Sequence, residues 1–282
     1  MNDQAYEADR QVAVRHAYRV SAYGLCPEER NLVREAPLLV QVNGQPVAVV
    51  MRTPGMDAEL SIGFCVCEGV VASADDVASV AVVRSCQGEP IDAVRCAGER
   101  WLGDMADIQL ARGAISASSA DRIRMVRAVA GDPETCSNSV LPSVRVDVRV
   151  GWQALAAARA DFDAAQRLRK RAGGVHGFGL YRDSGERLVV CEDVGRHNAM
   201  DKAIGWCLRH RLGDAWAFGL CSGRLSYEMV AKAARAELPI LVSFSAPSSL
   251  GVLTAERCEI TVVGYLEDSQ ALAYSHPERL VV

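Results

Sequence analysis

Two short apolar runs near the start of the chain predict a β-hairpin. The runs 37–42 and 46–51 flank Asn43-Gly44, a pair that readily adopts the positive φ of a tight turn. The residues before them, 1–34, are polar and irregular, and only 12–20 has the pattern of a short strand. We therefore expect an N-terminal arm followed by a hairpin.

A helical pattern follows the hairpin. Leu60, Phe64, Cys67 and Val71 recur at helical intervals, which predicts a helix over 57–71. After this helix the pattern predicts strands at 80–86, 91–96 and 107–110 and a helix at 121–130.

The second half of the chain alternates apolar runs with helical ones. It begins with an alanine-rich amphipathic helix over 152–171. The pattern then predicts strands at 177–181, 188–191, 216–221, 240–244 and 260–265, and helices at 199–209, 227–237 and 248–258. Strands that alternate with helices are typical of a layered α/β sheet, although its first two strands form a hairpin across 183–185.

These patterns divide the chain into four parts. We predict an arm over 1–34, a β-rich α/β subdomain with the hairpin over 35–130, a connecting loop over 131–150, and a second α/β subdomain over 151–282.

Composition and charge narrow the function classes. The chain has 282 residues, of which 50% are hydrophobic and 23% charged, and its net charge is -4. This balance favours neither nucleic-acid nor membrane-surface binding. No stretch approaches the roughly 18 apolar residues of a membrane span, and the acidic start is unlike a secretory signal. A cytoplasmic protein is expected.

Ten cysteines raise the question of a disulfide or metal framework. No pair has the two-residue spacing of a zinc knuckle or a redox dithiol, and the only close pair is Cys65 and Cys67. Two residues apart on a helix, these thiols point to different faces. We expect reduced thiols that pack as small apolar residues, and no metal site.

Cys136 differs from the other cysteines. It is a lone thiol in a polar connection that contains Pro133, with nothing apolar beside it to pack against. A reactive thiol needs exposure and polar or cationic neighbours, so chemistry is a plausible reason for its presence.

Polar residues gather where predicted strands and helices meet. His176 follows Gly173-Gly174 before a strand, either as part of a site or as an incidental residue after a helix cap. The segment 191–202 holds six ionisable side chains, among them Asp193, Arg196 and His197. Ion pairing and helix capping account for some of them, and an anion or heterocycle site accounts for the cluster better.

Two further junctions have the same character. Ser222 and Arg224 follow one strand, with Ser226 as a helix cap candidate, and Ser245 follows the next. We predict that the polar loops form one composite pocket, because ligands of α/β sheets bind where strands end and helices begin. Lys232 lies well inside a helix, where a solvated or ion-paired role is expected.

Several segments of the sequence together resemble the FdhD family of formate dehydrogenase accessory sulfur carriers. The resemblance runs from about residue 38 to the C-terminus. It rests on Val42-Asn43-Gly44, Met51-Arg52-Thr53-Pro54-Gly55, Glu59-Leu60, Gly63-Phe64, Glu68-Gly69, Gly173-Gly174-Val175-His176, 192–199 with Asp201-Lys202, 222–230 with Lys232, Ser245-Ala246-Pro247 and 274–280.

The resemblance implies both a function and a fold. Such proteins take sulfur as a persulfide from a cysteine desulfurase and deliver it to the molybdenum of Mo-bis(molybdopterin guanine dinucleotide), for insertion into formate dehydrogenase. It also implies a cytidine deaminase-like layered α/β core and a homodimer that binds the cofactor through its guanine ends. The zinc motif of deaminases is absent, so deaminase activity is not expected.

The central loop departs from the family pattern Cys-Gly-x-Cys-Gly. Here the matching stretch is Cys136-Ser137-Asn138-Ser139, so Cys136 stands in the place of the persulfide carrier and Ser139 in that of the second cysteine. One thiolate suffices to accept a sulfur. Release then needs another thiol or direct attack of the persulfide on the metal centre.

The cofactor-binding segment of the family also differs here. The matching residues are Tyr265, Leu266, Glu267, Asp268, Ser269 and Gln270. The two carboxylates repel a pyrophosphate unless they face guanine, whose N–H groups a carboxylate can accept.

Two other functions are compatible with the residues. One is a chaperone-like protein that binds the molybdenum cofactor of formate dehydrogenase without moving sulfur, which the serine at position 139 favours. The other is a nucleotide-metabolising enzyme on the same fold, which is weaker because the motifs contain no metal-ligand set or paired catalytic base.

Overall fold

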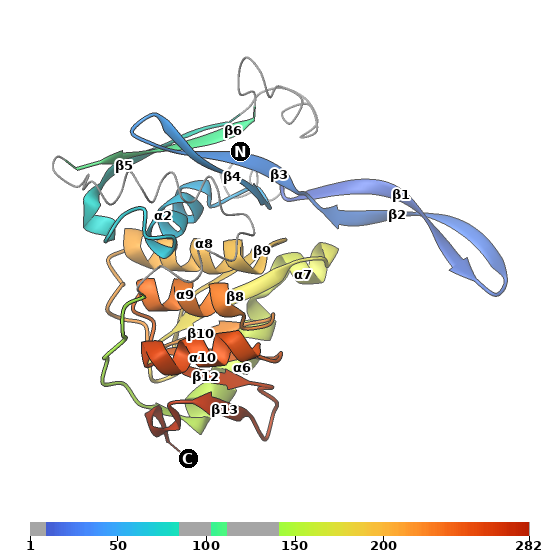
Figure 1. Cartoon of the computed structure of the whole chain (residues 1–282). Coiled ribbons are helices and arrows are strands. Elements are labelled where there is room, and N and C mark those ends of the chain that lie inside the picture. Colours follow the sequence, from blue (N-terminus) through green and yellow to red (C-terminus); the bar gives the residue numbers. More distant parts are fainter. Residues whose placement is uncertain (1–9, 85–102, 112–140, 282) are drawn as a thin grey trace.

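A six-stranded sheet forms the larger part of the structure, a computed structural model that describes residues 10–84, 103–111 and 141–281 (Figure 1). Its strand order is β13-β12-β11-β10-β8-β9. The strands are β8 (His176–Tyr181), β9 (Arg187–Asp193), β10 (Phe218–Cys221), β11 (Ile240–Ser243), β12 (Thr261–Gly264) and β13 (Leu272–Ser275). The five strands predicted in this region are confirmed, and β13 is additional.

Helices cover both faces of this sheet. They are α6 (Trp152–Ala165), α7 (Arg167–Ala172), α8 (Arg196–Arg209), α9 (Tyr227–Arg235) and α10 (Ser249–Cys258). On β11, Leu241 packs into the cluster that contains residues of α8, α9 and α10, whereas Ile240 and Val242 pack into the cluster built on α6. Strands buried on both faces are apolar throughout, which is why their sequence pattern is a continuous run.

The helix predicted over 152–171 is two helices in the structure. α6 ends at Ala165, and Gln166 has a non-helical ψ of 83° before α7 begins. The carboxylate of Glu192 accepts hydrogen bonds from Leu168 N and Arg169 N, each 2.8 Å long. Glu192 thus satisfies the first amide groups of α7, and this contact from β9 favours a new helix start.

A four-stranded sheet with order β4-β3-β6-β5 forms the N-terminal part. Its strands are β3 (Ala36–Val42), β4 (Gln45–Arg52), β5 (Val77–Val83) and β6 (Asp104–Leu110), and the helix α2 (Asp57–Cys67) packs on one face. The predicted hairpin is confirmed as β3 and β4. The helix ends at Cys67 rather than at 71, because Gly69 has a φ of 69° and Val70 N bonds to Cys65 O.

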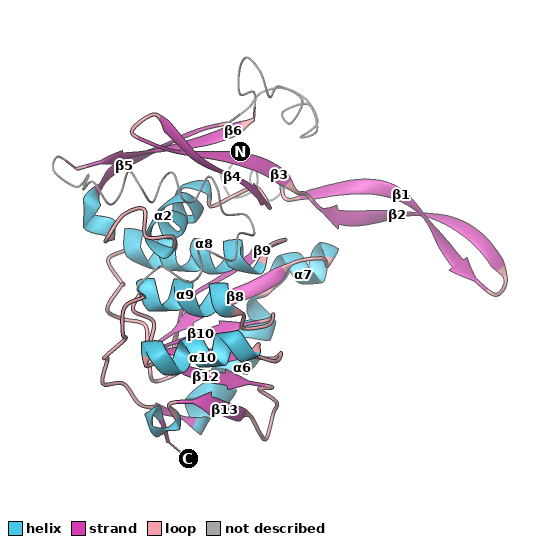
Figure 2. Cartoon of the chain, in the orientation of Figure 1, coloured by secondary structure: helices cyan, strands magenta, loops and turns pink. Residues whose placement is uncertain are grey.

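The predicted arm is a long β-ribbon rather than an irregular segment with one short strand. β1 (Val12–Ser21) pairs antiparallel with β2 (Gly24–Val33) through ten residues on each strand. The ribbon projects away from the rest of the chain (Figures 1 and 2). Most of its side chains are exposed, so no buried face imposes a clear alternating pattern on the sequence.

The segment after the central loop is held on the C-terminal sheet. Val144 is buried, its N–H donates to Cys258 O at 2.7 Å, and its carbonyl accepts from Arg279 Nη2 at 3.0 Å. Beyond it, β7 (Val150–Gly151) pairs in parallel with β14 (Leu280–Val281). Two short 3-10 helices lie at Ala74–Asp76 and Pro277–Arg279.

Helices α2 and α8 join the two parts at a close crossing. A Cβ placed on Gly63 would lie 1.9 Å from Asp201 O, and one on Gly205 would lie 1.9 Å from Glu59 O. The two backbones are therefore in direct contact, which only glycine permits at these positions.

Buried ion pairs lie around this crossing. Lys202 Nζ is 2.7 Å from Asp193 Oδ2, and its other partner is the Thr53 carbonyl at 2.8 Å. Lys232 Nζ lies 2.7 Å from Glu68 and 2.9 Å from Asp201. Lys232 is thus ion-paired and buried, and not solvated. Burial lowers the pKa of Lys232, but the two carboxylates outweigh this and raise its pKa.

The mixed α/β class expected from the sequence is confirmed, and its cytidine deaminase-like layering stays a prediction. The strand predicted at 91–96 and the helix at 121–130 lie outside the described residues. No helix in the described part of the chain is long and apolar enough to cross a membrane.

We expect Gly63→Ala to lower the free energy of unfolding by about 3 kcal/mol, because the added methyl group pushes α2 away from the backbone of α8. The control is Gly151→Ala, where a Cβ meets its nearest atom at 3.5 Å and a change below about 1 kcal/mol is expected. Urea denaturation measures both. Equal losses in the two variants contradict the close crossing.

Candidate functional site

Polar residues at the ends of several strands lie at one edge of the six-stranded sheet. We call this edge, which carries His176, Arg196, Ser222, Arg224 and Ser245, the polar edge. β10, β11 and β12 are parallel to one another, and β8 is antiparallel to both β10 and β9. The carboxyl ends of β9 to β12 therefore lie together with the first residue of β8. His176 pairs directly with Asp193 across the first two strands. This shared edge is the arrangement expected for the composite pocket.

Ser222 links two of the polar loops. Its Oγ accepts a hydrogen bond from Gly177 N at 3.0 Å and lies 3.3 Å from Nδ1 of His176. A Cβ on Gly223 would lie 3.2 Å from the same Nδ1 and 3.3 Å from Arg196 Cδ. His176, Arg196 and Ser222 are thus brought together, as the sequence predicts. Arg224 is exposed in the same loop.

The histidine at this edge has a perturbed proton affinity. Partial burial lowers the pKa of His176 below its usual value, and the positive charge of Arg196 lowers it further. The neutral imidazole is therefore favoured near pH 7, and it can donate or accept a hydrogen bond according to its tautomer.

His197 lies on the first turn of α8 and faces a carboxylate from α9. Its Nε2 is 2.9 Å from Glu228 Oε2, and this contact lowers the pKa of Glu228. Within the described chain, Nε of Arg196 and Oγ of Ser226 are buried atoms without a hydrogen-bond partner. Unpaired buried donors at a helix start are costly unless a ligand or water satisfies them.

Asp193 faces inward rather than toward a ligand. Its side chain is fully buried, Oδ2 accepts from Thr53 N at 3.0 Å, and Oδ1 accepts from Gly195 N and Asn198 Nδ2. With Lys202 as a further partner, the carboxylate has a structural role that fixes the loop before α8 on the N-terminal part. Direct contact of Asp193 with a cofactor stays a prediction.

Ser245 and Tyr265 extend the polar edge to β12. Ser245 N donates to Ser243 Oγ at 2.9 Å, and its carbonyl accepts from Tyr265 N at 3.3 Å. Tyr265 has a φ of 53° and a side chain that is 45% exposed, so its ring is accessible. Leu266 is buried in the core next to it, so its side chain cannot reach a ligand at the surface.

The acidic residues of this segment have protein partners. Asp268 pairs with Arg159 of α6, which also lies over the ring of Phe244 at 5.7 Å. Glu267 accepts a hydrogen bond from Gln270 Nε2 at 2.7 Å. The sequence gives no signal for Arg159, because an arginine in an alanine-rich helix has the pattern of a solvated residue. Ser269 is exposed in the same loop.

The thiols of the described residues fall into two groups. Cys26 is exposed on the arm, and six are buried, at positions 65, 67, 191, 207, 221 and 258. Burial raises the pKa of Cys207 to about 12 and that of Cys221 to about 11, and it also raises the pKa values of the other four. The packing role predicted for these six thiols agrees with their burial. Cys136 and Ser139 lie outside the described residues.

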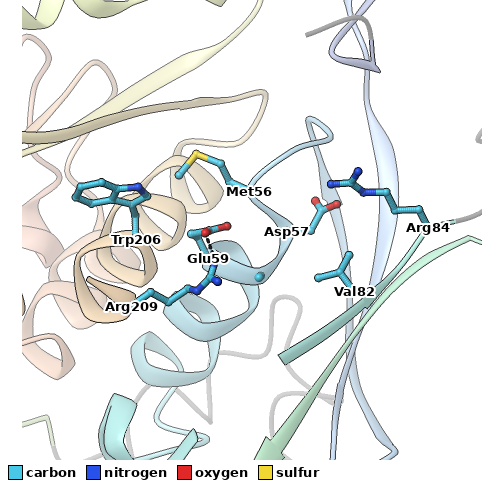
Figure 3. Close-up of a pocket in the computed structure, with 8 residues that line it drawn as sticks. Met56, Asp57, Glu59, Val82, Arg84, Trp206 and Arg209 are labelled. Atoms are coloured by element: carbon cyan, nitrogen blue, oxygen red, sulfur yellow. Dashed lines mark hydrogen bonds and ion pairs between the residues drawn. The ribbon is translucent and has the colours of Figure 1, made fainter. Parts of the chain in front are cut away.

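A separate cavity of about 400 Å³ lies at the other end of α8 (Figure 3). Met56 and Trp206 line one side, and Glu59 forms an ion pair with Arg209 within it. In the described part of the chain, no group of three or more His, Cys, Asp or Glu side chains is arranged to hold a metal ion.

The two larger sheets, their covering helices and the polar edge define a layered α/β protein with a candidate ligand site at the ends of its strands. The model of the FdhD/NarQ family matches residues 33–281. The chain belongs to this family, which confirms the resemblance in the sequence.

Several sulfur carrier proteins FdhD are similar over nearly the whole chain. Identity to that of Mycolicibacterium paratuberculosis is 36% over 267 residues, covering 88% of this chain and 91% of the relative. For Nocardia farcinica it is 36% over 281 residues, covering 96% and 95%. For Mycobacterium tuberculosis it is 34% over 288 residues, covering 95% and 98%.

A solved structure has the same fold. The crystal structure of a "putative formate dehydrogenase accessory protein" from Desulfotalea psychrophila matches with a TM-score of 0.73 and 24% identity, covering 96% of this chain and all of the other.

We expect the pKa of His176, measured by NMR titration, to lie below its usual value of about 6.5. Arg196→Gln removes one cause and raises this pKa, although burial keeps it below the usual value. Arg209→Gln, at the other end of α8, is the control and leaves it unchanged. A pKa that responds equally to both variants contradicts the proximity of Arg196 and His176.

Proposed function

We propose that this chain is a cytoplasmic sulfur carrier required for formate dehydrogenase activity. It accepts sulfur from a cysteine desulfurase as a persulfide on Cys136 and transfers it to Mo-bis(molybdopterin guanine dinucleotide). The observation that carries the proposal is the similarity, over nearly the whole chain, to proteins named sulfur carrier protein FdhD. The name of the structural neighbour supports the link to formate dehydrogenase.

The state of the described thiols supports Cys136 as the carrier. The attacking species in persulfide transfer is a thiolate, and burial disfavours it at six positions. Cys26 is exposed, but it pairs with Arg19 close to the turn of the arm. The arm precedes the residues that the family model matches. Cys136 has the polar sequence around it that a reactive thiol requires, and Cys86 and Cys96, like Cys136, lie outside the described residues.

The transfer is a thiol exchange. The Cys136 thiolate attacks the outer sulfur of the donor persulfide, the S–S bond of the donor breaks, and the donor cysteine leaves as a thiolate. Delivery of this sulfur as sulfide consumes two electrons. Because Ser139 cannot close a disulfide with Cys136, either an external thiol or the metal centre supplies these electrons.

The polar edge is the proposed binding site for a guanine end of the substrate. Arg196 and Arg224 are cations suited to phosphate, and Nε of Arg196 and Oγ of Ser226 are buried atoms that lack a hydrogen-bond partner among the described residues. Asp268 is paired with Arg159, so it repels a phosphate less than a free carboxylate does. The neutral His176 and the accessible ring of Tyr265 add hydrogen-bonding and stacking partners.

A homodimer is part of this proposal, because the substrate has two guanine ends and one chain has one polar edge. The alternative function is a chaperone that binds the cofactor without moving sulfur, which the serine at position 139 favours. The two functions differ in whether Cys136 carries sulfur.

We expect the chain to gain the mass of one sulfur on incubation with a cysteine desulfurase and cysteine. The gain disappears with a thiol reductant and is absent in Cys136→Ala, because Cys136 is the proposed carrier. Cys26→Ala, which removes the exposed thiol of the arm, is the control and keeps the gain. Intact-mass analysis with peptide mapping measures it.

The same pair of variants distinguishes the two functions in cells. Cys136→Ala should fail to restore formate dehydrogenase activity to a strain that lacks its own carrier. If it restores full activity, the sulfurtransferase function is wrong and the chaperone function holds.

We expect Arg196→Gln to weaken binding of guanosine diphosphate by about tenfold or more, because it removes a charge-assisted hydrogen bond to a phosphate. Arg209→Gln, at the opposite end of the same helix, is the control and leaves the affinity unchanged. Isothermal titration calorimetry measures both. Equal affinities in the two variants place the nucleotide elsewhere.

A further inference from the structure

The short helix α7 carries positive charge that the described residues do not neutralise. Arg167, Arg169 and Lys170 are exposed on it. Arg169 Nη1 donates to Gln166 Oε1 at 3.3 Å and Lys170 Nζ donates to Ala164 O at 3.0 Å, so both cations bond to neutral acceptors. Within the described part of the chain, no carboxylate forms an ion pair with any of the three side chains. In a chain whose net charge is -4, α7 is therefore a local concentration of positive charge.

Two contacts place α7 beside the polar edge. Glu192 of β9 accepts hydrogen bonds from the first amides of α7, and in the sheet it pairs with Gly177, the residue after His176. Gln166 Oε1, which accepts from Arg169, would lie 3.0 Å from a Cβ on the same Gly177. Arg169 therefore lies beside the first residues of β8.

Arg196 approaches the same end of β8 from the other face of the sheet. A Cβ on Gly223 would lie 3.2 Å from His176 Nδ1 and 3.3 Å from Arg196 Cδ. Arg196 begins α8, whereas α7 follows α6, which packs on the opposite face. Burial lowers the pKa of His176, and the charges of Arg196 and Arg169 are among those that lower it further. Two guanidinium groups thus flank the first residue of β8, an arrangement suited to a phosphate.

The other end of the polar edge is acidic. The loop after β12 carries Glu267 and Asp268, and both are exposed. Asp268 Oδ1 pairs with Arg159, and Oδ2 accepts no hydrogen bond from the described residues. Arg159 therefore orients a carboxylate that can still accept hydrogen bonds from a ligand. Guanine presents a ring N–H and an amino group, which are donors to such a carboxylate, and the accessible ring of Tyr265 offers a stacking surface.

The length and charge of the edge suit one orientation of a nucleotide. In the order β8-β10-β11-β12 the outer two strands are three strand spacings apart, about 14 Å. A nucleoside diphosphate carries its base and its phosphates on opposite ends of the ribose, and in an extended form it has a comparable length. Its phosphates are attracted to α7 and repelled by Glu267 and Asp268. The donors of its guanine are attracted to these carboxylates and repelled by arginine, so the reverse orientation is disfavoured at both ends.

We propose that a guanine nucleotide end of the substrate binds along the polar edge in one orientation, with its phosphates at Arg169 and Arg196 and its base at Asp268. The inference rests on the proposed nucleotide site and deepens it, because it names the groups that bind each part of the ligand. Arg167 and Lys170 act at longer range and attract the anion to this end of the edge.

The affinities of guanosine diphosphate and xanthosine diphosphate, measured by isothermal titration calorimetry, test the phosphate end. Arg169→Gln should weaken the binding of both nucleotides by about tenfold, because it removes a charge-assisted hydrogen bond to the phosphates that they share. The ratio of the two affinities should not change. The control Arg182→Gln removes a cation that pairs with Glu186 beyond the opposite end of β8, and it should leave both affinities unchanged.

The same two nucleotides test the base end. Xanthine has a carbonyl where guanine has its amino group, so a carboxylate repels it and a side-chain amide can donate to it. Asp268→Asn should therefore weaken guanosine diphosphate by about tenfold and strengthen xanthosine diphosphate. In the reverse orientation this variant removes a negative charge beside the phosphates and strengthens both. Arg169 and Asp268 are exposed, and thermal melting verifies that the variants fold.

The outcomes separate this inference from the proposed function. The orientation is wrong if Asp268→Asn strengthens both nucleotides or leaves both unchanged, or if Arg169→Gln acts no more strongly than the control. In each of these cases the wild-type chain still binds guanosine diphosphate, and the nucleotide site stands. A wild-type chain that does not bind guanosine diphosphate at about 1 mM overturns the nucleotide site together with its orientation, whereas sulfur loading of Cys136 is measured separately.

Discussion

The crossing of α2 on α8 is the contact on which the arrangement of the molecule depends. Gly63 and Gly205 bring the two helix backbones together, and no larger residue fits between them. This closeness lets two buried lysines reach partners on several elements. Lys202 joins Asp193 to the Thr53 carbonyl, and Lys232 joins α9 to α8 and α2. Because an unpaired buried charge costs several kcal/mol, each lysine fixes the separation of the elements that hold its partners.

The crossing of α2 on α8 and its buried lysines also fix the geometry of the polar edge. Asp193 ends β9 and is held by Lys202 and by Thr53 N, so the loop before α8 starts from a fixed point. Arg196 and His197 follow within one turn, where the helix dipole and the loop amides favour an anion. Arg196 and His197 of the candidate site are thus positioned by buried residues behind them.

The sequence predicted the elements that are buried on both sides, and missed those defined by distant contacts. The strands at 218–221 and 240–243 are apolar throughout because helices cover both faces. By contrast, the break at Gln166 depends on Glu192, which lies on another strand. The second strand of the arm was missed because a ribbon without a buried face carries only a weak alternation.

The candidate site likewise has features that the sequence could predict and features that it could not. The clustering of His176, Arg196 and Ser222 followed from the rule that parallel strands end at one edge. The inward orientation of Asp193 and the pairing of Asp268 with Arg159 could not be predicted, because each depends on a side chain that is remote in sequence.

The anchoring of Val144 sets an upper limit on its distance from the central thiol. Cys136 precedes Val144 by eight residues, so an extended chain allows it a radius of at most about 28 Å. Val144 is held beside the last residue of α10, at the edge of the sheet opposite the polar edge. The ten residues of α10 span about 15 Å, less than this radius. The covalent limit thus includes both edges of the sheet, so the length of the chain does not require a donor and a receiver to approach from the same side.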